Sequence, residues 1–328
     1  MITNCIRALG TFAVFCLGLA SLAGPAVAQT YPDRPIRIIV PFAAGGGSDV
    51  VGRAIAQKLT EKLGQSVAVE NRTGAGGSLG ATVVARAPAD GYTLLLGSSS
   101  EIALYPNVAA NVPYDSQRDF IPIALLATVP LVLTVTESFP VKSVQELLAY
   151  ARANPGKLNY GSAGPGSTTH MAMVLFNTMT NTTMTHVPYR GSTPVITDLL
   201  AGNLQVAIAT MAAVTPHAGG GKLRFIAVST AKRATTLPDL PTIAESGVPG
   251  YAVGLWTGLL APANTPPAIV AKLNAAVAES LASPDLKDML ARQGAEQSGS
   301  TPEQFAEEIK RETAVWRDVV QKTGIRID

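Results

Sequence analysis

The fold of this chain is decided by one stretch near its start, Ile36-Arg37-Ile38-Ile39-Val40-Pro41-Phe42-Ala43-Ala44-Gly45-Gly46-Gly47-Ser48-Asp49. Its first residues form a β-branched apolar run that predicts a buried strand, and Pro41 ends that run. Three glycines then allow a tight turn with exposed N–H groups. Ser48 is a favourable N-cap, and Asp49 suits the positive end of a helix. A strand, a glycine-rich loop and a helix N-terminus together predict an anion-binding site.

Short apolar runs alternate with amphipathic segments along most of the chain, which predicts the α/β class with parallel sheets and right-handed crossovers. Three helices in succession are expected at the C-terminal end. The predicted strands are 37–40, 67–70, 92–96, 131–135, 158–160, 184–187, 206–209 and 225–229. The predicted helices are 49–63, 79–86, 144–153, 169–178, 194–201, 267–283, 285–293 and 302–323.

The first 28 residues have the pattern of a secretory signal peptide. Arg7 supplies a basic start, 12–22 is apolar, and Ala26-Val27-Ala28 is an A-x-A cleavage signal. We therefore expect export, cleavage after Ala28 and a mature chain that begins at Gln29. A lipoprotein is disfavoured, because bulky Phe15 precedes the only suitable cysteine, Cys16.

Composition excludes several classes of function. Both cysteines, Cys5 and Cys16, lie in the leader, so the mature chain is expected to hold no disulfide, iron–sulfur cluster or cysteine–zinc site. The formal charge of +2 falls to +1 without Arg7, which is too balanced for nucleic acid or an anionic membrane as the main partner. Removal of 28 residues from 328 leaves 300, a length that suits two domains.

Two apolar stretches are expected to cross between these domains. One is 121–133, punctuated by Pro122 and Pro130, and the other is 251–262, which contains Trp256. If both cross, the two ends of the chain build one domain and the middle builds the other. The predicted boundaries are 29–129 with 249–328 for the first domain, and 130–248 for the second.

Further small-residue loops follow predicted strands in both domains. Ligands of open α/β sheets bind outside the carboxyl ends of the strands, so these loops would face each other across a cleft. Hydroxyl and free N–H groups predominate in them, which fits a carboxylate held by neutral dipoles. Any single loop of this kind is more simply a turn. These loops are 74–78, 97–100, 161–168 and 189–192.

A secreted serine hydrolase is the alternative from another class of function. Gly76-Gly77-Ser78-Leu79-Gly80 matches G-x-S-x-G, a motif that requires a strand directly before it and acid and histidine partners. Here 71–75 separates the motif from the nearest predicted strand, so Ser78 is a poor candidate nucleophile. We expect no catalytic residue.

Nucleotide and metal sites also lack their signatures. The chain has no G-x-x-x-x-G-K-[ST] motif, and Val50 stands where G-x-G-x-x-G would need its third glycine. The three histidines lack metal-ligand spacing, so we expect no metal and no cofactor. His170, beside a helix start, has equal claims to a ligand and a structural role, whereas His186 and His217 are more simply structural.

Other candidate residues keep two interpretations. Asp49 either favours the helix dipole or accepts a hydrogen bond from a ligand hydroxyl or amine, or from a neighbouring loop amide. Phe42 packs either in the core or on the apolar body of a ligand. Arg190 either pairs with a carboxylate in a bidentate manner or is a solvated loop residue.

With these residues in view, the chain resembles the Bug receptor family, the periplasmic solute-binding proteins of tripartite tricarboxylate transporters. The resemblance covers about Tyr31 to Ile325. Its motifs are Tyr31-Pro32-Asp33-Arg34-Pro35-Ile36, Pro41-Phe42-Ala43-Ala44-Gly45-Gly46 with Asp49, Glu70-Asn71-Arg72 with Gly74-Ala75-Gly76-Gly77, Asp90-Gly91-Tyr92-Thr93-Leu94, Gly161-Ser162-Ala163-Gly164 with His170, Val187-Pro188-Tyr189-Arg190-Gly191-Ser192, and Leu237-Pro238-Asp239-Leu240-Pro241-Thr242.

The resemblance implies a two-domain periplasmic-binding-protein fold of type II, the Venus flytrap, with a cleft between two mixed or parallel sheets. It implies a periplasmic monomer that binds a di- or tricarboxylate, an acidic amino acid or an aromatic acid and contacts inner-membrane permease subunits transiently. A receptor that feeds a membrane signalling kinase is the alternative. The implied ligand-binding residues are Phe42, Gly45, Ser48, Asp49, Ala75, Gly76, Ser98, Ala163, Gly164, Ser167, Thr168, His170, Tyr189 and Ser192.

One departure from the family pattern concerns the helix after His170. Met173 and Val174 stand where the family usually has glycine and glutamate before Leu-Phe, and Met171, Met179 and Met184 add to an apolar, sulfur-rich flank. Core packing is the simpler interpretation. The functional one is a pocket widened for a bulkier, aromatic carboxylate.

Overall fold

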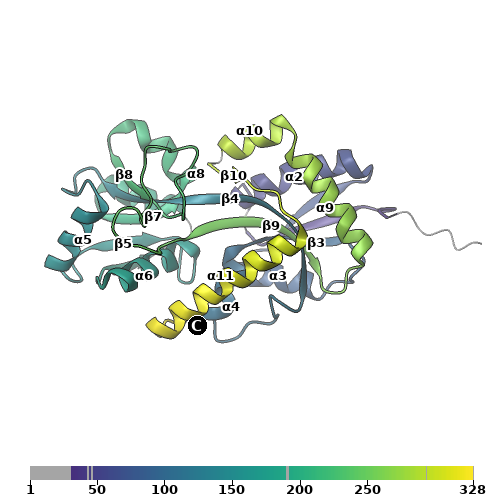
Figure 1. Ribbon diagram of the computed structural model, residues 1–328, viewed down its shortest axis with the longest axis horizontal. Coiled ribbons are helices and arrows are strands. Elements are labelled where there is room, and N and C mark those ends of the chain that lie inside the picture. The colour runs from purple at the N-terminus through teal and green to yellow at the C-terminus, as the bar shows by residue number, and fades with distance from the viewer. Residues whose placement is uncertain (1–30, 43, 46, 190–191, 293, 328) are drawn as a thin grey trace, which may run out of the picture. The chain divides into compact units, whose positions relative to one another are not determined.

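A mixed β-sheet runs through the protein and joins its two lobes (Figure 1). The computed structural model describes residues 31–327 apart from 43, 46, 190–191 and 293, so the predicted signal peptide and its cleavage site lie outside the described residues. The strands are β1 (Ile36–Val40), β2 (Val67–Asn71), β3 (Thr93–Ser98), β4 (Phe120–Thr136), β5 (Asn159–Ser162), β6 (Thr185–Pro188), β7 (Val206–Thr210), β8 (Leu223–Val228), β9 (Gly254–Pro262) and β10 (Glu296–Gln297).

Helices fill the intervals between the strands (Figure 1), and side-chain caps start two of them. Ser143 accepts from the Glu146 amide, and Thr301 with Gln304 forms a complete capping box. The helices are α2 (Gly47–Leu63), α3 (Ser78–Ala85), α4 (Tyr105–Val108), α5 (Val144–Ala153), α6 (Thr168–Thr180), α7 (Ser192–Ala201), α8 (Met211–Val214), α9 (Pro267–Leu281), α10 (Pro284–Arg292) and α11 (Pro302–Thr323), with short turns η1 (Ala75–Gly77), η2 (Ser100–Leu104) and η3 (Thr215–Gly220).

We call the part built on β1, β2, β3 and β9 the first lobe, and the part built on β5 to β8 the second lobe. In the first lobe β1 pairs in parallel with β2 and β3, and β9 is antiparallel to β3. In the second lobe β5 pairs in parallel with β6 and β7. The prediction of parallel sheets is therefore too simple, because the two strands that return along the molecule, β4 and β9, are antiparallel to their neighbours.

The two lobes share one strand, β4, which is 17 residues long. It pairs with β9 from Phe120 to Pro130 and with β7 from Leu131 to Val135, so its partners change at the Pro130–Leu131 step. Proline cannot donate to the sheet, and the register accordingly shifts beside Pro122. The sequence indicated a crossing here, and the predicted domain boundaries themselves remain a prediction.

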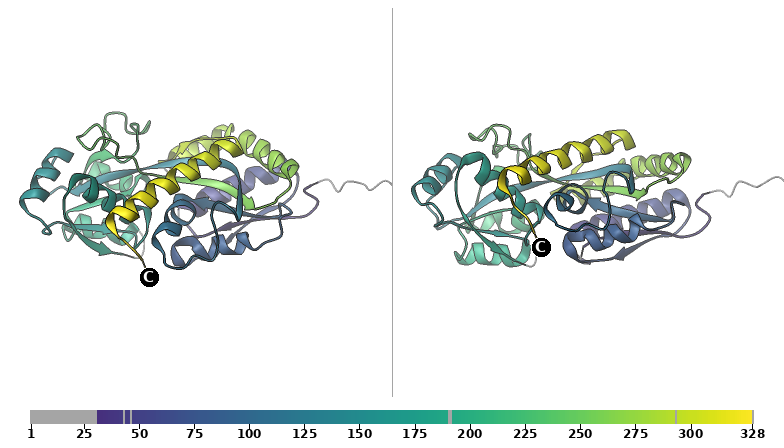
Figure 2. Two further views of the ribbon diagram at one scale, coloured as in Figure 1. Left: turned by 60° about the horizontal axis from the view of Figure 1, so that its bottom comes forward. Right: turned by 90° about the horizontal axis from the view of Figure 1, so that it is seen from below.

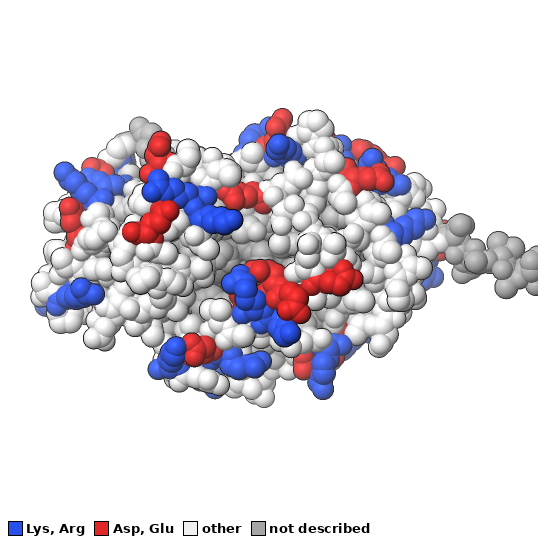
Figure 3. Space-filling model, viewed as in Figure 1, with Lys and Arg blue, Asp and Glu red and all other residues white. Residues whose placement is uncertain are grey.

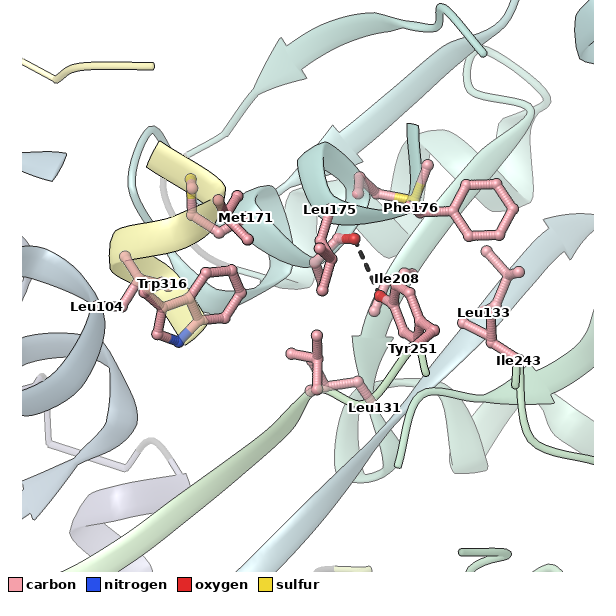
Figure 4. Close-up of a cluster of buried hydrophobic side chains, with 14 of the residues drawn as sticks. Leu104, Leu131, Leu133, Met171, Leu175, Phe176, Ile208, Ile243, Tyr251 and Trp316 are labelled. Atoms are coloured by element: carbon pink, nitrogen blue, oxygen red, sulfur yellow. Dashed lines mark hydrogen bonds between the residues drawn. The ribbon is translucent and has the colours of Figure 1, made fainter. Parts of the chain in front are cut away.

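The buried core is continuous from one lobe to the other. Figure 4 shows Met171 of α6 beside Trp316 of α11 and Leu104 of η2, with Leu131 of β4 nearby. Further into the second lobe the Tyr251 hydroxyl donates to the Ala172 carbonyl over 2.9 Å. The core therefore attaches α6 to both the long strand and the last helix.

A buried carboxyl joins β9 to α11, the helix that packs along β4 (Figure 2). Glu312 is 8% exposed and accepts from both indole groups of the chain, Trp256 Nε1 and, over 3.1 Å, Trp316 Nε1. Phe305 packs edge-on against Trp256, with ring centroids 5.0 Å apart. Burial raises the pKa of Glu312 to about 7, against the hydrogen bonds from the two indoles.

This shift makes stability depend on pH. Glu312 ionises near pH 4.5 when unfolded and near 7 when folded, so the folded state is penalised progressively as the pH rises between these values, by up to about 3 kcal/mol. We expect Glu312→Gln to remove this part of the pH dependence. Urea unfolding followed by circular dichroism at several pH values measures it.

The exposed Glu307 on the same helix supplies the control, since Glu307→Gln should leave the pH dependence unchanged. Equal pH dependence in wild type and Glu312→Gln would contradict the assignment.

Candidate functional site

Asp49 ties the opening glycine-rich loop to the sheet. It is 3% exposed, and its Oδ2 accepts from the Gly45 amide and from Arg53 Nε, each over 2.9 Å. Its Oδ1 accepts from Asn71 Nδ2, which also donates to the Phe42 carbonyl, again over 2.9 Å in both cases. These bonds lower the pKa of Asp49 to about 2, chiefly through Arg53, so the carboxylate is ionised at neutral pH. Its observed partners include the loop amide that the sequence analysis gave as one alternative.

The second loop of the first lobe lies against the first. Ala75, Gly76 and Gly77 have successive positive φ values of 46°, 63° and 96°, and Ala75 and Gly76 are exposed. A Cβ at Gly77 would lie 3.2 Å from the Phe42 ring and 3.2 Å from Glu101 Oε2. Only glycine fits both this conformation and this approach. Phe42 is thus half-buried beneath η1, and Ser48, in the first turn of α2, is also half-buried.

Ser98 ends β3 beside a carboxyl that the sequence analysis missed. Glu101 is fully buried and accepts from the Ser98 amide over 2.5 Å and from the Ser98 hydroxyl over 2.6 Å. Burial raises the pKa of Glu101 to about 7. The S-x-x-E spacing of these two residues is that of a capping box and could have revealed the pair.

The neighbouring serines connect this loop to the rest of the molecule. Ser100 Oγ lies 2.9 Å from Thr168 Oγ1, at the start of α6 in the second lobe. Ser99 Oγ accepts from the Trp256 amide of β9 over 3.2 Å. The loop after β3 therefore contacts both the second lobe and a long return strand.

The loop between β5 and α6 gathers most of the predicted residues of the second lobe. Ser167 caps α6, since its hydroxyl oxygen accepts from the His170 amide over 3.2 Å and donates to the Gly164 carbonyl over 2.7 Å. The Ala163 amide donates to Thr169 Oγ1 over 3.0 Å. Thr168 and Thr169 provide the first amides of α6, which have no acceptor within the helix and favour an anion.

The loop after β6 lies beside this one. The Tyr189 amide donates to the Ser162 carbonyl over 3.0 Å, and a Cβ at Gly164 would lie 3.2 Å from the Tyr189 carbonyl oxygen. Burial raises the pKa of Tyr189 to about 12, and the hydrogen bond that its hydroxyl donates to Asp198 adds to this shift. Ser192 begins α7, while Arg190 lies outside the described residues.

Most of the methionine-rich flank belongs to the core. Met171 and Met173 are fully buried in the cluster that spans the lobes, Met184 is 6% exposed and Met179 is 40% exposed. The packing interpretation therefore accounts for Met171 and Met173 without a widened pocket.

A surface hollow of about 570 Å³ lies elsewhere, beside α4 and α11. Tyr114, Asp115, Arg118 and Arg317 are among its lining residues, and none of the predicted site residues lines it. Charges of both signs are interspersed over the face seen in Figure 3. Within the described ranges no three histidine or acidic side chains group as metal ligands, and no described helix has the length and apolarity needed to cross a membrane.

Solved structures of similar proteins define the class of this one. R. palustris Rpa4515 with adipate is 42% identical, with a TM-score of 0.81, and the match covers 90% of this chain and 99% of that one. MatC (Rpa3494) from Rhodopseudomonas palustris with bound malate is 35% identical, with a TM-score of 0.78, over 88% of this chain and all of the other. The fold is that of a two-domain periplasmic solute-binding protein, as the sequence predicted.

The sequence comparisons narrow the class to a family. The model of the tripartite tricarboxylate transporter family receptor, TctC, matches residues 51–325. Protein BugT of Bordetella pertussis is 38% identical over 325 residues, 99% of each chain. A UPF0065 protein in the tcbD-tcbE intergenic region of Pseudomonas sp. (strain P51) is 39% identical over 314 residues, covering 91% of this chain and 92% of the relative. The chain belongs to the TctC, or Bug, family of periplasmic receptors, and the predicted resemblance is confirmed.

The internal bonds of Asp49 generate a stability prediction. Asp49→Ala removes the carboxylate that accepts hydrogen bonds from Gly45, Asn71 and Arg53. We therefore expect the free energy of unfolding to fall by about 1–3 kcal/mol at neutral pH and the Gly45 amide to exchange faster. Because the folded pKa lies near 2, below the ordinary 3.8, the difference should shrink as the pH falls through that range. Urea unfolding and amide exchange measure both effects.

Asp288→Ala, on the exposed surface of α10, is the control and should change neither quantity. Unchanged Gly45 exchange in Asp49→Ala would show that the loop is held by other contacts.

Proposed function

We propose that this receptor binds a small carboxylate between its two lobes and presents it to the permease of a tripartite tricarboxylate-type transporter. The observation that carries the proposal is the meeting of Ser100 with Thr168 over 2.9 Å. This contact places the loop after β3 against the N-terminal turn of α6, where helix amides favour an anion. The two relatives described above hold adipate and malate, so an aliphatic dicarboxylate is the proposed ligand class.

The proposed site uses backbone amides and hydroxyls from both lobes rather than a cationic side chain. The first lobe would contribute Phe42, Gly45, Ser48, Ala75, Gly76 and Ser98, with Asp49 holding the loop. The second would contribute Ala163, Gly164, Ser167, Thr168, His170, Tyr189 and Ser192.

Binding would close the receptor by population shift. A ligand that bridges dipoles of both lobes interacts with the closed state far better than with the open one. A dissociation constant of about 1 μM corresponds to about −8 kcal/mol, and a differential affinity of about 5.5 kcal/mol is enough to move an equilibrium from 1:99 to 99:1. We further propose that the mature protein begins at Gln29 and acts as a monomer.

The two alternatives to a transport receptor are a serine hydrolase and a ligand sensor. A hydrolase would need Ser78 as nucleophile, but this side chain is 3% exposed and lies seven residues after the end of β2. A sensor would use the same binding event to inform a membrane kinase. Genes for permease subunits or for two-component proteins beside this one would separate transport from sensing.

A thermal-shift screen followed by calorimetry tests the ligand class. We expect dicarboxylates such as adipate or malate to stabilise the protein and neutral sugars or amines to leave it unchanged. Stabilisation by sugars or amines and by no carboxylate would overturn the proposal.

Covalent labelling tests the hydrolase. A serine-directed phosphonate should leave Ser78 unmodified in the folded protein, as judged by mass spectrometry. Stoichiometric modification of Ser78 would favour the enzyme over the receptor.

Asp49 should affect affinity through the loop that it holds. In Asp49→Ala the ligand must order this loop itself, at a cost of about 1.4 kcal/mol, so we expect about tenfold weaker binding of the best dicarboxylate. Calorimetry on folded protein measures this, with Asp288→Ala as the control. Wild-type affinity in Asp49→Ala would leave this carboxylate a purely structural role.

A further inference from the structure

Three aromatic rings form a stack behind the loop between β5 and α6. The rings of His170 and His186 have centroids 3.9 Å apart and are inclined by 15°. Tyr160 lies beside this pair, 5.0 Å from His186 and 6.3 Å from His170, and its ring is inclined to theirs by 21° and 16°. The rings come from α6, β6 and β5 respectively, and Tyr160 and His170 are only 3% and 6% exposed. The His170 and Tyr160 rings therefore restrict the orientation of the His186 ring from two neighbouring sides.

His170 bonds to the loop through one specified nitrogen. The Gly166 amide donates to His170 Nδ1 over 3.1 Å, so Nδ1 is an acceptor and the proton of the neutral ring lies on Nε2. A second proton would have to bind at Nδ1, where it would face the Gly166 N–H. Gly166 has a φ of +72°, and a Cβ there would lie 2.4 Å from Ile327. Protonation of His170 therefore breaks the hydrogen bond from the Gly166 amide to Nδ1, at a position where the glycine is tightly packed.

His186 bonds to the same loop through Ser162. His186 Nε2 lies 2.7 Å from Ser162 Oγ, which is also 3.1 Å from the Gly164 amide nitrogen and 3.2 Å from the Gly164 carbonyl oxygen. A hydroxyl has one proton and two lone pairs. All three contacts are satisfied when His186 Nε2–H and the Gly164 N–H donate to the hydroxyl and the hydroxyl donates to the Gly164 carbonyl. A second proton, on His186 Nδ1, leaves this arrangement intact.

Burial keeps both imidazole rings neutral at pH 7. Burial first, and then His186, lowers the pKa of His170 to about 4, and burial lowers the pKa of His186. Tyr160 faces His186 from β5, and burial raises its pKa to about 12. Beyond the stack, Tyr189 is paired with Asp198 of α7, and Arg326 bonds the Asn107 carbonyl beside Ile327.

We propose that His170 and His186 are positioning residues of the carboxylate loop, and that a proton on His186 strengthens carboxylate binding whereas a proton on His170 weakens it. This inference rests on the proposed function, because it assumes that the loop formed by 162–168 takes the carboxylate. A cation on His186 lies directly behind Ser162 and attracts the anion. A cation on His170 removes the acceptor of Gly166, and like charges in adjacent rings exclude double protonation.

The size of the effect follows from reciprocity. If a bound carboxylate raises the pKa of His186, the proton raises the carboxylate affinity by the same factor. A rise of one pKa unit corresponds to at most about a tenfold change in Kd. We therefore expect wild-type affinity to increase by up to about tenfold as the pH falls from about 7.5 to below the ordinary histidine pKa of about 6.5, beyond the titration of the ligand itself.

Calorimetry with adipate on wild type and His186→Gln isolates the contribution of His186 to the pH dependence of the affinity. Glutamine reproduces the Nε2 donor but does not titrate, and the ligand's own titration is common to both proteins. We expect the pH-dependent gain to be present in wild type and in His217→Gln, a histidine of η3 outside the stack, and absent in His186→Gln. Parallel pH profiles of wild type and His186→Gln would overturn the linkage.

Nuclear magnetic resonance without ligand tests the positioning role by itself. The Gly166 amide resonance should follow the titration of His170 in wild type. In His170→Asn, whose side-chain oxygen can replace Nδ1 as acceptor, the resonance should stay wild-type-like without titrating, whereas in His170→Leu it should move to an unbonded position. A Gly166 amide resonance that changes neither with the titration of His170 nor in His170→Asn or His170→Leu would overturn the positioning role.

The two arms separate the two proposals. Failure of every carboxylate to bind at any pH would overturn the proposed function and the affinity linkage together. A Gly166 amide that follows His170 in that same protein would still support the positioning role.

Discussion

The long strand β4 is the constraint on which the rest of the structure depends. One stretch of backbone pairs with β9 in the first lobe and with β7 and β8 in the second. Its two prolines lie where the register shifts and where the partners change, so the absence of an N–H is placed where the ladder is already interrupted. Because both lobes hydrogen-bond to the same strand, the loops at their facing ends already lie close together before a ligand binds.

Those loops are held largely by their own side chains. Asp49, Glu101 and His170 each accept a hydrogen bond from a backbone amide of the loop beside them, and Ser167 accepts from the His170 amide of α6. A loop ordered in this way loses little entropy when a ligand binds, which favours affinity without many direct contacts. The carboxyl groups of Asp49 and Glu101 differ in charge. Asp49 has the guanidinium of Arg53 and is ionised, whereas Glu101 is buried with neutral donors and ionises only near pH 7.

The regular elements were largely predictable, because their signals are local. Helices α5 and α11 have the bounds that the sequence pattern predicted, Val144–Ala153 and Pro302–Thr323. The crossing made by β4 was indicated by the apolar stretch 121–133, but strand structure was predicted only for 131–135, because the two prolines interrupt the strand pattern before it. The family motifs named loops that the structure places at adjoining strand ends. They could not reveal the stacking of His186 on His170, because rings from β6 and α6 meet only in the folded protein. For Met171 and Met173 the sequence favoured core packing but left a widened pocket open, since an apolar side chain beside a ligand loop has the same sequence signal as one in the core.

The sharing of Glu312 by Trp256 and Trp316 gives the protein a built-in optical reporter. The chain has two tryptophans, and both donate to this one carboxyl where β9 meets α11. Their emission therefore reports on a single environment, and it responds both to the charge on Glu312 and to any displacement of α11 against the return strand. Movements of the lobes that strain this junction would be visible in the unlabelled protein, in real time and at low concentration.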